Sequence, residues 1–68
     1  MYGLKRERKR AGLTAAELAK KLGCTFRAVY DWEAGYYWPR AELLPQIAAA
    51  LGCTIDDLFR EEVAHGTH

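Results

Sequence analysis

Four side chains able to contact the edges of base pairs project from one side of a helix expected over residues 25–34: Phe26, Arg27, Tyr30 and Asp31. An arginine can bond guanine O6 and N7 together, and an aromatic ring can pack on the thymine methyl group. Tyr30 could bond a phosphate or a base edge, and Asp31 could accept from cytosine N4 or exclude other sequences. This face favours the reading of double-stranded DNA, although the four residues could also be ordinary surface side chains.

The turn that precedes this helix has a spacing that fixes the angle between two helices. The pattern consists of Ala19, Gly23, Val29 and Trp32. A small residue allows the two helices to cross closely, the glycine makes the turn, and two apolar residues anchor the second helix. This spacing predicts a helix-turn-helix, whose second helix can enter a DNA major groove.

A repeated tetrapeptide marks where helices end and begin. LGCT occupies residues 22–25 and 51–54, and the looser copy AGLT occupies residues 11–14. In each copy the glycine tolerates the left-handed conformation that ends a helix, and the threonine can cap the next helix. The residue between them is expected to pack back onto the preceding turn, and this position is held by Leu13, Cys24 and Cys53.

These joints, together with a glycine at position 35, predict five helices, at residues 2–11, 14–22, 25–34, 41–51 and 54–62. Apolar residues recur within them at spacings of three and four. Pro45 is tolerated only in a first turn, so regular helix is expected to begin near Leu43 or Leu44. Because no segment alternates with period two for long enough to form a strand, the expected fold class is all-α, a compact five-helix domain.

Length and composition restrict the class of protein. Sixty-eight residues, half of them hydrophobic, predict one domain, expected over residues 1–63, with residues 64–68 as a disordered polar tail. No apolar run approaches the ~20 residues of a membrane span. The basic residues near the start are not followed by the apolar segment of a signal peptide. We therefore expect a cytoplasmic protein without a membrane partner.

Charge is distributed unevenly along the chain, although the net charge is only +1. Residues 1–27 carry eight Lys or Arg and two acids, whereas residues 28–68 carry two Arg and seven acids. A basic half that faces a polyanion, with the acidic half turned away, is typical of a nucleic-acid binder. Charges scattered over a solvated surface are the alternative. Only the first LGCT suits DNA, because phosphates would repel the acids that follow the second: Asp56, Asp57, Glu61 and Glu62.

Taken together, the motifs from Leu4 to Phe59 resemble the Cro/C1-type helix-turn-helix domains of phage repressors and bacterial regulators of the XRE family. The matching pieces are Gly12-Leu13-Thr14, Glu17-Leu18-Ala19, Leu22-Gly23, Val29, Trp32-Glu33-Ala34-Gly35, Pro39, Leu51-Gly52 and Asp57-Leu58-Phe59. The resemblance implies a lambda-repressor-like fold and a transcriptional regulator, expected to be a repressor. It also implies a homodimer on a palindromic DNA operator, without a catalytic centre.

Five residues outside the base-reading set are expected to contact DNA phosphates: Thr14, Ala15, Thr25, Tyr37 and Arg40. The two threonines begin the motif helices, so their hydroxyls and the adjacent N–H groups can bind phosphate. Helix capping alone would also explain them. Family members often have a glutamine just after the first threonine, where this chain has Ala15. In the loop that follows residues 25–34, Arg40 is the strongest candidate for a phosphate contact.

The loop after the reading helix holds three consecutive aromatic residues, Tyr36, Tyr37 and Trp38. Tyrosine hydroxyls can contact phosphates, but an aromatic run also suggests a surface for a protein partner. Alternatively, Trp38 folds back over the core. A second function is therefore kept open: a protein-interaction module or antitoxin-like adaptor that uses this loop and the acidic last helix, with weak or secondary DNA binding.

Arg8 is expected to point inward, because it shares a stripe with Leu4 and Ala11. A buried guanidinium requires a partner. Glu33, at the margin of the buried face of the reading helix, is the natural one, and the family has an arginine–glutamate pair at these positions. The role would be structural. The alternative is that the Arg8 side chain extends along its stem to solvent.

Catalysis lacks the necessary residues. The chain has no serine, its histidines are His65 and His68, and no carboxylate pair is expected in a cleft. The two cysteines lack CxxC spacing, and a disulfide is disfavoured in the expected compartment. We therefore expect no enzyme, no metal site, no cofactor and no small-molecule site.

Overall fold

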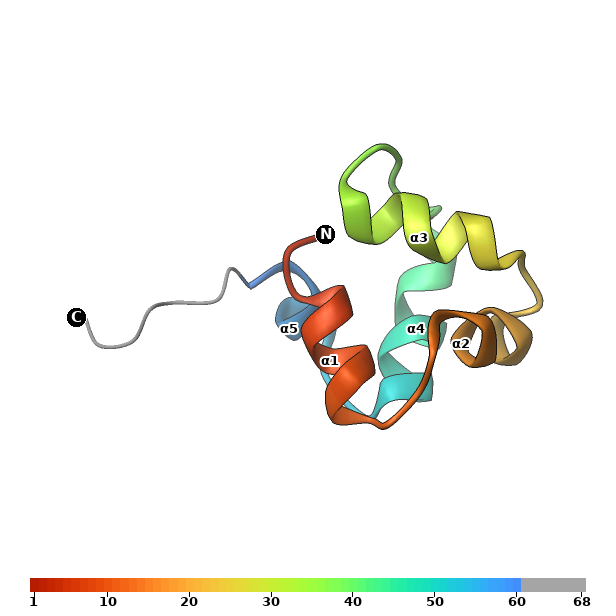
Figure 1. Cartoon of the computed structure of the whole chain (residues 1–68). Coiled ribbons are helices and arrows are strands. Elements are labelled where there is room, and N and C mark those ends of the chain that lie inside the picture. Colours follow the sequence, from red (N-terminus) through yellow and green to blue (C-terminus); the bar gives the residue numbers. More distant parts are fainter. Residues whose placement is uncertain (61–68) are drawn as a thin grey trace.

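The computed structural model describes residues 1–60 (Figure 1). In chain order its elements are α1 (Leu4–Arg10), α2 (Ala15–Leu22), α3 (Phe26–Ala34), the 3-10 turn η1 (Ala41–Leu43), α4 (Leu44–Leu51) and α5 (Ile55–Phe59). The prediction of a compact all-α fold with five helices is confirmed, and residues 1–60 contain no strand. The boundary predicted after residue 63 and the tail predicted at 64–68 lie outside the described residues.

Two of the helices begin with capping boxes at the predicted threonines. The Oγ1 of Thr14 accepts from the N–H of Glu17 at 3.1 Å, and the Glu17 carboxylate accepts from the N–H of Thr14 at 2.8 Å. Thr54 and Asp57 exchange the same two bonds at 3.1 and 3.0 Å. The bond from the Thr54 N–H, with a smaller contribution from the Thr54 side chain, lowers the pKa of the Asp57 carboxyl. These boxes satisfy N–H groups that have no partner within the helix.

The fourth predicted helix has two parts. Ala41–Leu43 forms the 3-10 turn, and regular helix begins at Leu44, as the position of Pro45 predicts. Proline is tolerated in this first turn because the N–H that it lacks would have no helical acceptor there. The chain can therefore turn into α4 without losing a backbone hydrogen bond.

The core contains one fully buried side chain from each α-helix: Leu4, Leu18, Val29, Ile47 and Leu58. Trp32 adds a large ring from α3 and is 7% exposed. Cys24 and Cys53 pack against this core as predicted, but both are only partly buried, and both are free thiols. Burial raises the pKa of both thiols, which keeps them protonated and apolar in character.

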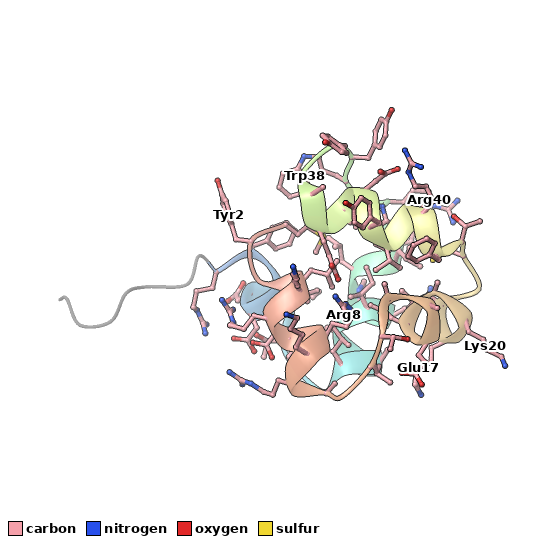
Figure 2. All side chains as sticks on the ribbon, in the orientation of Figure 1. Tyr2, Arg8, Glu17, Lys20, Trp38 and Arg40 are labelled. Carbon is pink, nitrogen blue, oxygen red and sulfur yellow. The ribbon has the colours of Figure 1, made fainter. Side chains whose placement is uncertain are left out.

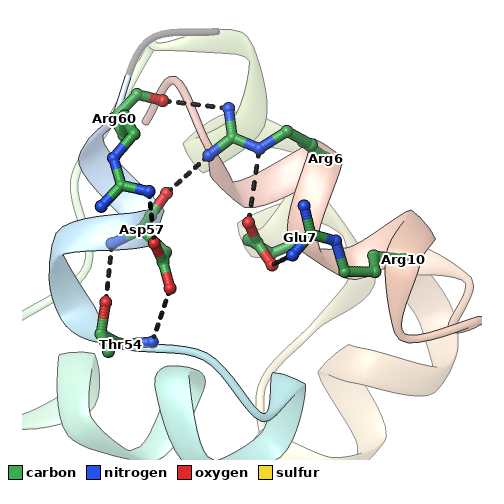
Figure 3. A network of polar contacts seen from close by, with 6 residues as sticks. All are labelled: Arg6, Glu7, Arg10, Thr54, Asp57 and Arg60. Atoms are coloured by element: carbon green, nitrogen blue, oxygen red, sulfur yellow. Dashed lines mark hydrogen bonds and ion pairs between the residues drawn. The ribbon is translucent and has the colours of Figure 1, made fainter.

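The basic and acidic halves of the sequence are not separated in space, because α1 packs beside α5. Arg6 donates to the carbonyl oxygens of Asp57 at 3.0 Å and of Arg60 at 3.1 Å (Figure 3). The side chain of Glu7 turns inward, is 4% exposed, and is flanked by Arg6 at 3.3 Å and Arg10 at 3.6 Å. The basic first helix therefore lies beside the acidic last helix, and the expected separation of the two halves does not hold along this contact.

Gly3 lies where the start of α1 meets α5, and its N–H donates to the Leu58 carbonyl at 2.9 Å. A Cβ at this position would overlap the carbonyl oxygen of Asp57, which is a backbone atom that cannot rotate away. We expect Gly3→Ala to lower the free energy of unfolding by about 2 kcal/mol, measured by urea denaturation. The matched control is Gly52→Ala, which meets no atom within 4 Å and changes only a backbone with φ +70°. That control should lose about 1 kcal/mol, and an equal or larger loss than Gly3→Ala would contradict the predicted overlap.

Candidate nucleic-acid interface

The predicted turn joins α2 to α3, and the two helices pack against each other. α2 ends at Gly23, whose φ of +72° is rarely adopted by residues with a side chain. The Oγ1 of Thr25 then accepts from the N–H of Ala28 at 3.1 Å and begins α3. Ala19 and Val29 lie in the core, and Figure 1 shows the two helices running in clearly different directions. This is the helix-turn-helix arrangement that the spacing predicts.

Three of the four residues predicted to read bases lie on the surface of α3. Phe26 is 57% exposed and Tyr30 54% exposed, and the side chain of Arg27 is 77% exposed. The rings of Phe26 and Tyr30 lie one turn apart, with centroids separated by 6.4 Å. Together these residues form one continuous surface of two aromatic rings and a guanidinium, which we call the α3 face.

The fourth residue, Asp31, is less accessible than expected. Its side chain is only 14% exposed and accepts from the Nε of Arg27 at 3.2 Å. Within residues 1–60, the Nη groups of Arg27 make no hydrogen bond, so the end of the guanidinium stays open. Asp31 therefore orients the guanidinium of Arg27 through Nε and leaves the Nη groups pointing away from it. Residues four apart on a helix are neighbours, so the sequence spacing could have indicated this pair.

The phosphate candidates lie at the starts of α2 and α3 and in the loop after α3, and they differ in which of their groups already form hydrogen bonds. The hydroxyl oxygens of Thr14 and Thr25 accept the capping bonds, which leaves each hydroxyl proton free to donate. The side chain of Ala15 packs against the core, so only its backbone N–H, at the start of α2, could reach a phosphate. Tyr37 and Arg40 are exposed, and Figure 2 shows Arg40 projecting beside α3.

The aromatic loop does not cover the core. Tyr36, Tyr37 and Trp38 are 69%, 66% and 64% exposed. Trp38 stacks on Phe59 with ring centroids 5.5 Å apart and an interplanar angle of 17°, and Phe59 itself packs against the core. The loop is therefore attached to the end of α5 by one stacking contact, and the interpretation in which Trp38 folds back over the core is wrong.

The structure brings Arg8 and Glu33 together across α1 and α3. The Nε of Arg8 donates to Glu33 Oε2 at 2.6 Å and its Nη2 donates to Oε1 at 3.2 Å, while Nη1 donates to the Leu13 carbonyl at 2.9 Å. The two side chains are 12% and 8% exposed, so Arg8 does not extend to solvent, although Ala11 of the same predicted stripe is exposed. The bond to Glu33 raises the pKa of the Arg8 guanidinium above its ordinary value.

Sequence reasoning missed how many cations of the first half serve the fold. Arg6, Arg8 and Arg10 are all engaged with groups of the same chain. Four lysines are exposed and form no ion pair with another described residue: Lys5, Lys9, Lys20 and Lys21. The exposed cations of residues 1–60 are these lysines together with the arginines Arg10, Arg27, Arg40 and Arg60.

The described residues offer neither a metal site nor a membrane-spanning helix. No cluster of three or more His, Cys, Asp or Glu side chains in residues 1–60 is arranged to hold a metal ion. His65 and His68 lie outside this range. Every helix in residues 1–60 is too short or too polar to cross a membrane.

Comparison with known proteins agrees with this geometry. A family model described as helix-turn-helix matches residues 4–58, which include all five helices except the last residue of α5. A protein of Methanothermobacter thermautotrophicus, named as an uncharacterized HTH-type transcriptional regulator, is 40% identical over 57 residues, which cover 82% of this chain and 83% of the relative. The chain therefore belongs to the Cro/C1-type (XRE) helix-turn-helix family.

Proposed function

We propose that this protein is a sequence-specific regulator of transcription that places α3 in the major groove of double-stranded DNA. The observation that carries the proposal is the α3 face, where Phe26, Arg27 and Tyr30 are all more than half exposed on a helix anchored by Val29 and Trp32. Large exposed aromatic side chains are unusual on a solvated helix. They suit a surface that is covered when DNA binds.

Each residue of the α3 face has a chemical role in this proposal. The open Nη groups of Arg27 donate to guanine O6 and N7, while Asp31 positions the guanidinium through Nε. Phe26 packs on a thymine methyl group, and Tyr30 bonds a base edge or a phosphate. Asp31 is thus a positioning residue and not a direct reader of cytosine.

Contacts to the DNA backbone fix the orientation of α3. We assign them to the hydroxyls of Thr14 and Thr25, the N–H of Ala15, and the side chains of Tyr37 and Arg40. The Arg8–Glu33 pair contributes indirectly, because it joins α1 to α3 and holds the turn before α2 through the Leu13 carbonyl.

The assembled regulator in this proposal is a homodimer on a palindromic operator, acts as a repressor in the cytoplasm, and has no catalytic role. A dimer would place two α3 helices one turn of DNA apart, with half-sites centred about 10 base pairs apart or at a multiple of this distance. The family supports this assembly, since its members commonly bind palindromic operators as dimers.

One observation favours a second function. The exposed aromatic loop at Tyr36–Trp38 is larger and more apolar than a phosphate contact requires, and it would suit a protein partner. In that case the protein would act as an adaptor or antitoxin-like module, with DNA binding weak or secondary.

The salt dependence of DNA affinity distinguishes the two functions. A phosphate releases its counterion only when a cation neutralises it, so each lysine or arginine contact should make the slope of the logarithm of the association constant against the logarithm of salt concentration about 0.9 more negative. With Arg40 among the assigned contacts, the slope of one subunit should be about −1 or steeper. The measurement is a fluorescence-anisotropy titration of a duplex over a series of salt concentrations. A slope near zero, or no binding of any duplex, would contradict DNA as the main partner and favour the adaptor.

A further inference from the structure

We propose that the outer surface of α1 is a second contact with the DNA backbone, in which Lys5 and Lys9 bind phosphates on the strand that passes beside α3. This inference rests on the proposed function and extends its interface to a helix outside the helix-turn-helix. It assigns a role to two of the four lysines that the fold leaves without an ion-pair partner among the described residues.

The first observation is the placement of like charges. Lys5 and Lys9 are four residues apart, so their side chains lie one above the other on the exposed surface of α1. Like charges at this spacing destabilise a helix, and neither lysine pairs with an acid in residues 1–60. The only acid in α1 is Glu7, and its side chain points inward and is 4% exposed. The outer surface of α1 is therefore purely cationic.

The second observation is a shallow hollow on this surface, about 400 Å³ in volume, lined by Tyr2, Lys5, Arg6 and Lys9. Arg6 is already engaged by the carbonyl oxygens of Asp57 and Arg60, which holds its guanidinium in place. Tyr2 is 70% exposed and adds a phenol hydroxyl beside the lysines. Ammonium and phenol groups around an open hollow match the oxygens of a phosphate diester.

The third observation connects this hollow to the α3 face. A smaller hollow of about 170 Å³ is lined by Lys5, Tyr30, Glu33 and Ala34, so Lys5 borders both hollows. Tyr30 belongs to the α3 face. The carboxylate of Glu33 is neutralised by two bonds from Arg8 and does not repel a phosphate strongly.

A DNA strand that passes Tyr30 would therefore continue over Lys5 to Lys9. An acidic protein segment could be attracted by the same lysines, but the shared border with Tyr30 favours the ligand that α3 binds. Because the Arg8–Glu33 pair fixes α1 against α3, the distance between the two contacts is set by the fold.

The test is the double variant Lys5→Gln/Lys9→Gln. Losing two phosphate contacts should make the salt slope of DNA binding about 1.8 less negative, with the same loss of affinity on preferred and random duplexes. The matched control is Lys20→Gln/Lys21→Gln, which removes the same charge from α2, where Figure 2 shows Lys20 pointing away from α1. All four lysines are exposed, so both variants should keep the wild-type melting temperature within about 2 °C.

A duplex with a neutral methylphosphonate at one phosphate locates the contact. Neutralising the phosphate bound by Lys5 or Lys9 should weaken DNA binding by the wild-type protein. It should not change DNA binding by Lys5→Gln/Lys9→Gln.

Suppose that the wild-type protein binds DNA with Arg27-dependent specificity but that both double variants change the salt slope equally. The α1 contact is then overturned, and the proposed function stands. If the wild-type protein binds no DNA, the proposed function itself fails. A titration with an acidic peptide tests the protein alternative. If Lys5→Gln/Lys9→Gln loses binding of this peptide but keeps the DNA affinity of the wild type, the α1 contact with DNA is overturned and the ligand of this surface is protein.

Discussion

Replacing Arg8 with methionine is expected to lower the free energy of unfolding by about 3–5 kcal/mol, because it leaves the carboxylate of Glu33 buried without its partner. Glu33 is 8% exposed and receives two of its bonds from Arg8 at 2.6 and 3.2 Å. The Leu13 carbonyl also loses its donor. The measurement is urea denaturation followed by circular dichroism. A loss of this size is comparable to the whole stability of a small domain, so the variant should be largely unfolded at 37 °C.

The matched control removes both charges. Arg8→Met/Glu33→Leu leaves no unpaired ion and should recover most of the lost stability, because a buried ion pair contributes little relative to apolar residues of similar size. Arg8→Lys keeps the charge but loses the two-bond geometry, and it should fall between wild type and Arg8→Met. If Arg8→Met changed neither stability nor DNA affinity, the pair would have no role in holding α3.

Replacing Arg27 with alanine is expected to weaken binding of the preferred DNA sequence by about 1–3 kcal/mol, roughly 5- to 150-fold, and to relax the preference at one base pair. Arg27 is exposed and its Nη groups are open, so the variant should be as stable as the wild type within about 0.5 kcal/mol. The measurement is a titration of the preferred duplex and of duplexes changed at each position. Affinity for random DNA should change little.

Asp31→Ala provides the comparison for this variant. It removes the bond to Arg27 Nε at 3.2 Å but leaves the guanidinium present. We expect a smaller loss of affinity than for Arg27→Ala, with the same base preferred at the same position. If Arg27→Ala lost affinity equally on all sequences, Arg27 would be a phosphate contact. A changed base preference in Asp31→Ala would show that Asp31 reads a base directly.

The helix ends and the α3 face could be predicted from the sequence because their causes are local. A glycine with positive φ and a threonine cap act within three or four residues, so Gly23 and Thr25 mark the turn wherever the chain packs. The outward side of α3 follows from helical periodicity once Val29 and Trp32 are assigned to the core. The Arg8–Glu33 pair could be predicted because a guanidinium on the inward side of a helix requires an acidic partner.

The features that sequence reasoning missed depend on contacts between distant segments. Glu7 becomes buried only because α1 packs beside α5, and Trp38 stays exposed because it stacks on Phe59 and not on the core. Arg6 is one of the eight cations of residues 1–27, yet it donates to carbonyl oxygens more than fifty residues away. Backbone acceptors leave no pattern in residue types, so no spacing rule could have assigned this role.

If the α3 face reads base pairs, selection of binding sites from a pool of random duplexes should show it. The wild-type protein should enrich a palindromic sequence whose half-sites contain a guanine, and Arg27→Ala should lose the preference for that guanine alone. A pool with no enriched sequence, or an enriched guanine that Arg27→Ala still selects, would contradict this role of the α3 face.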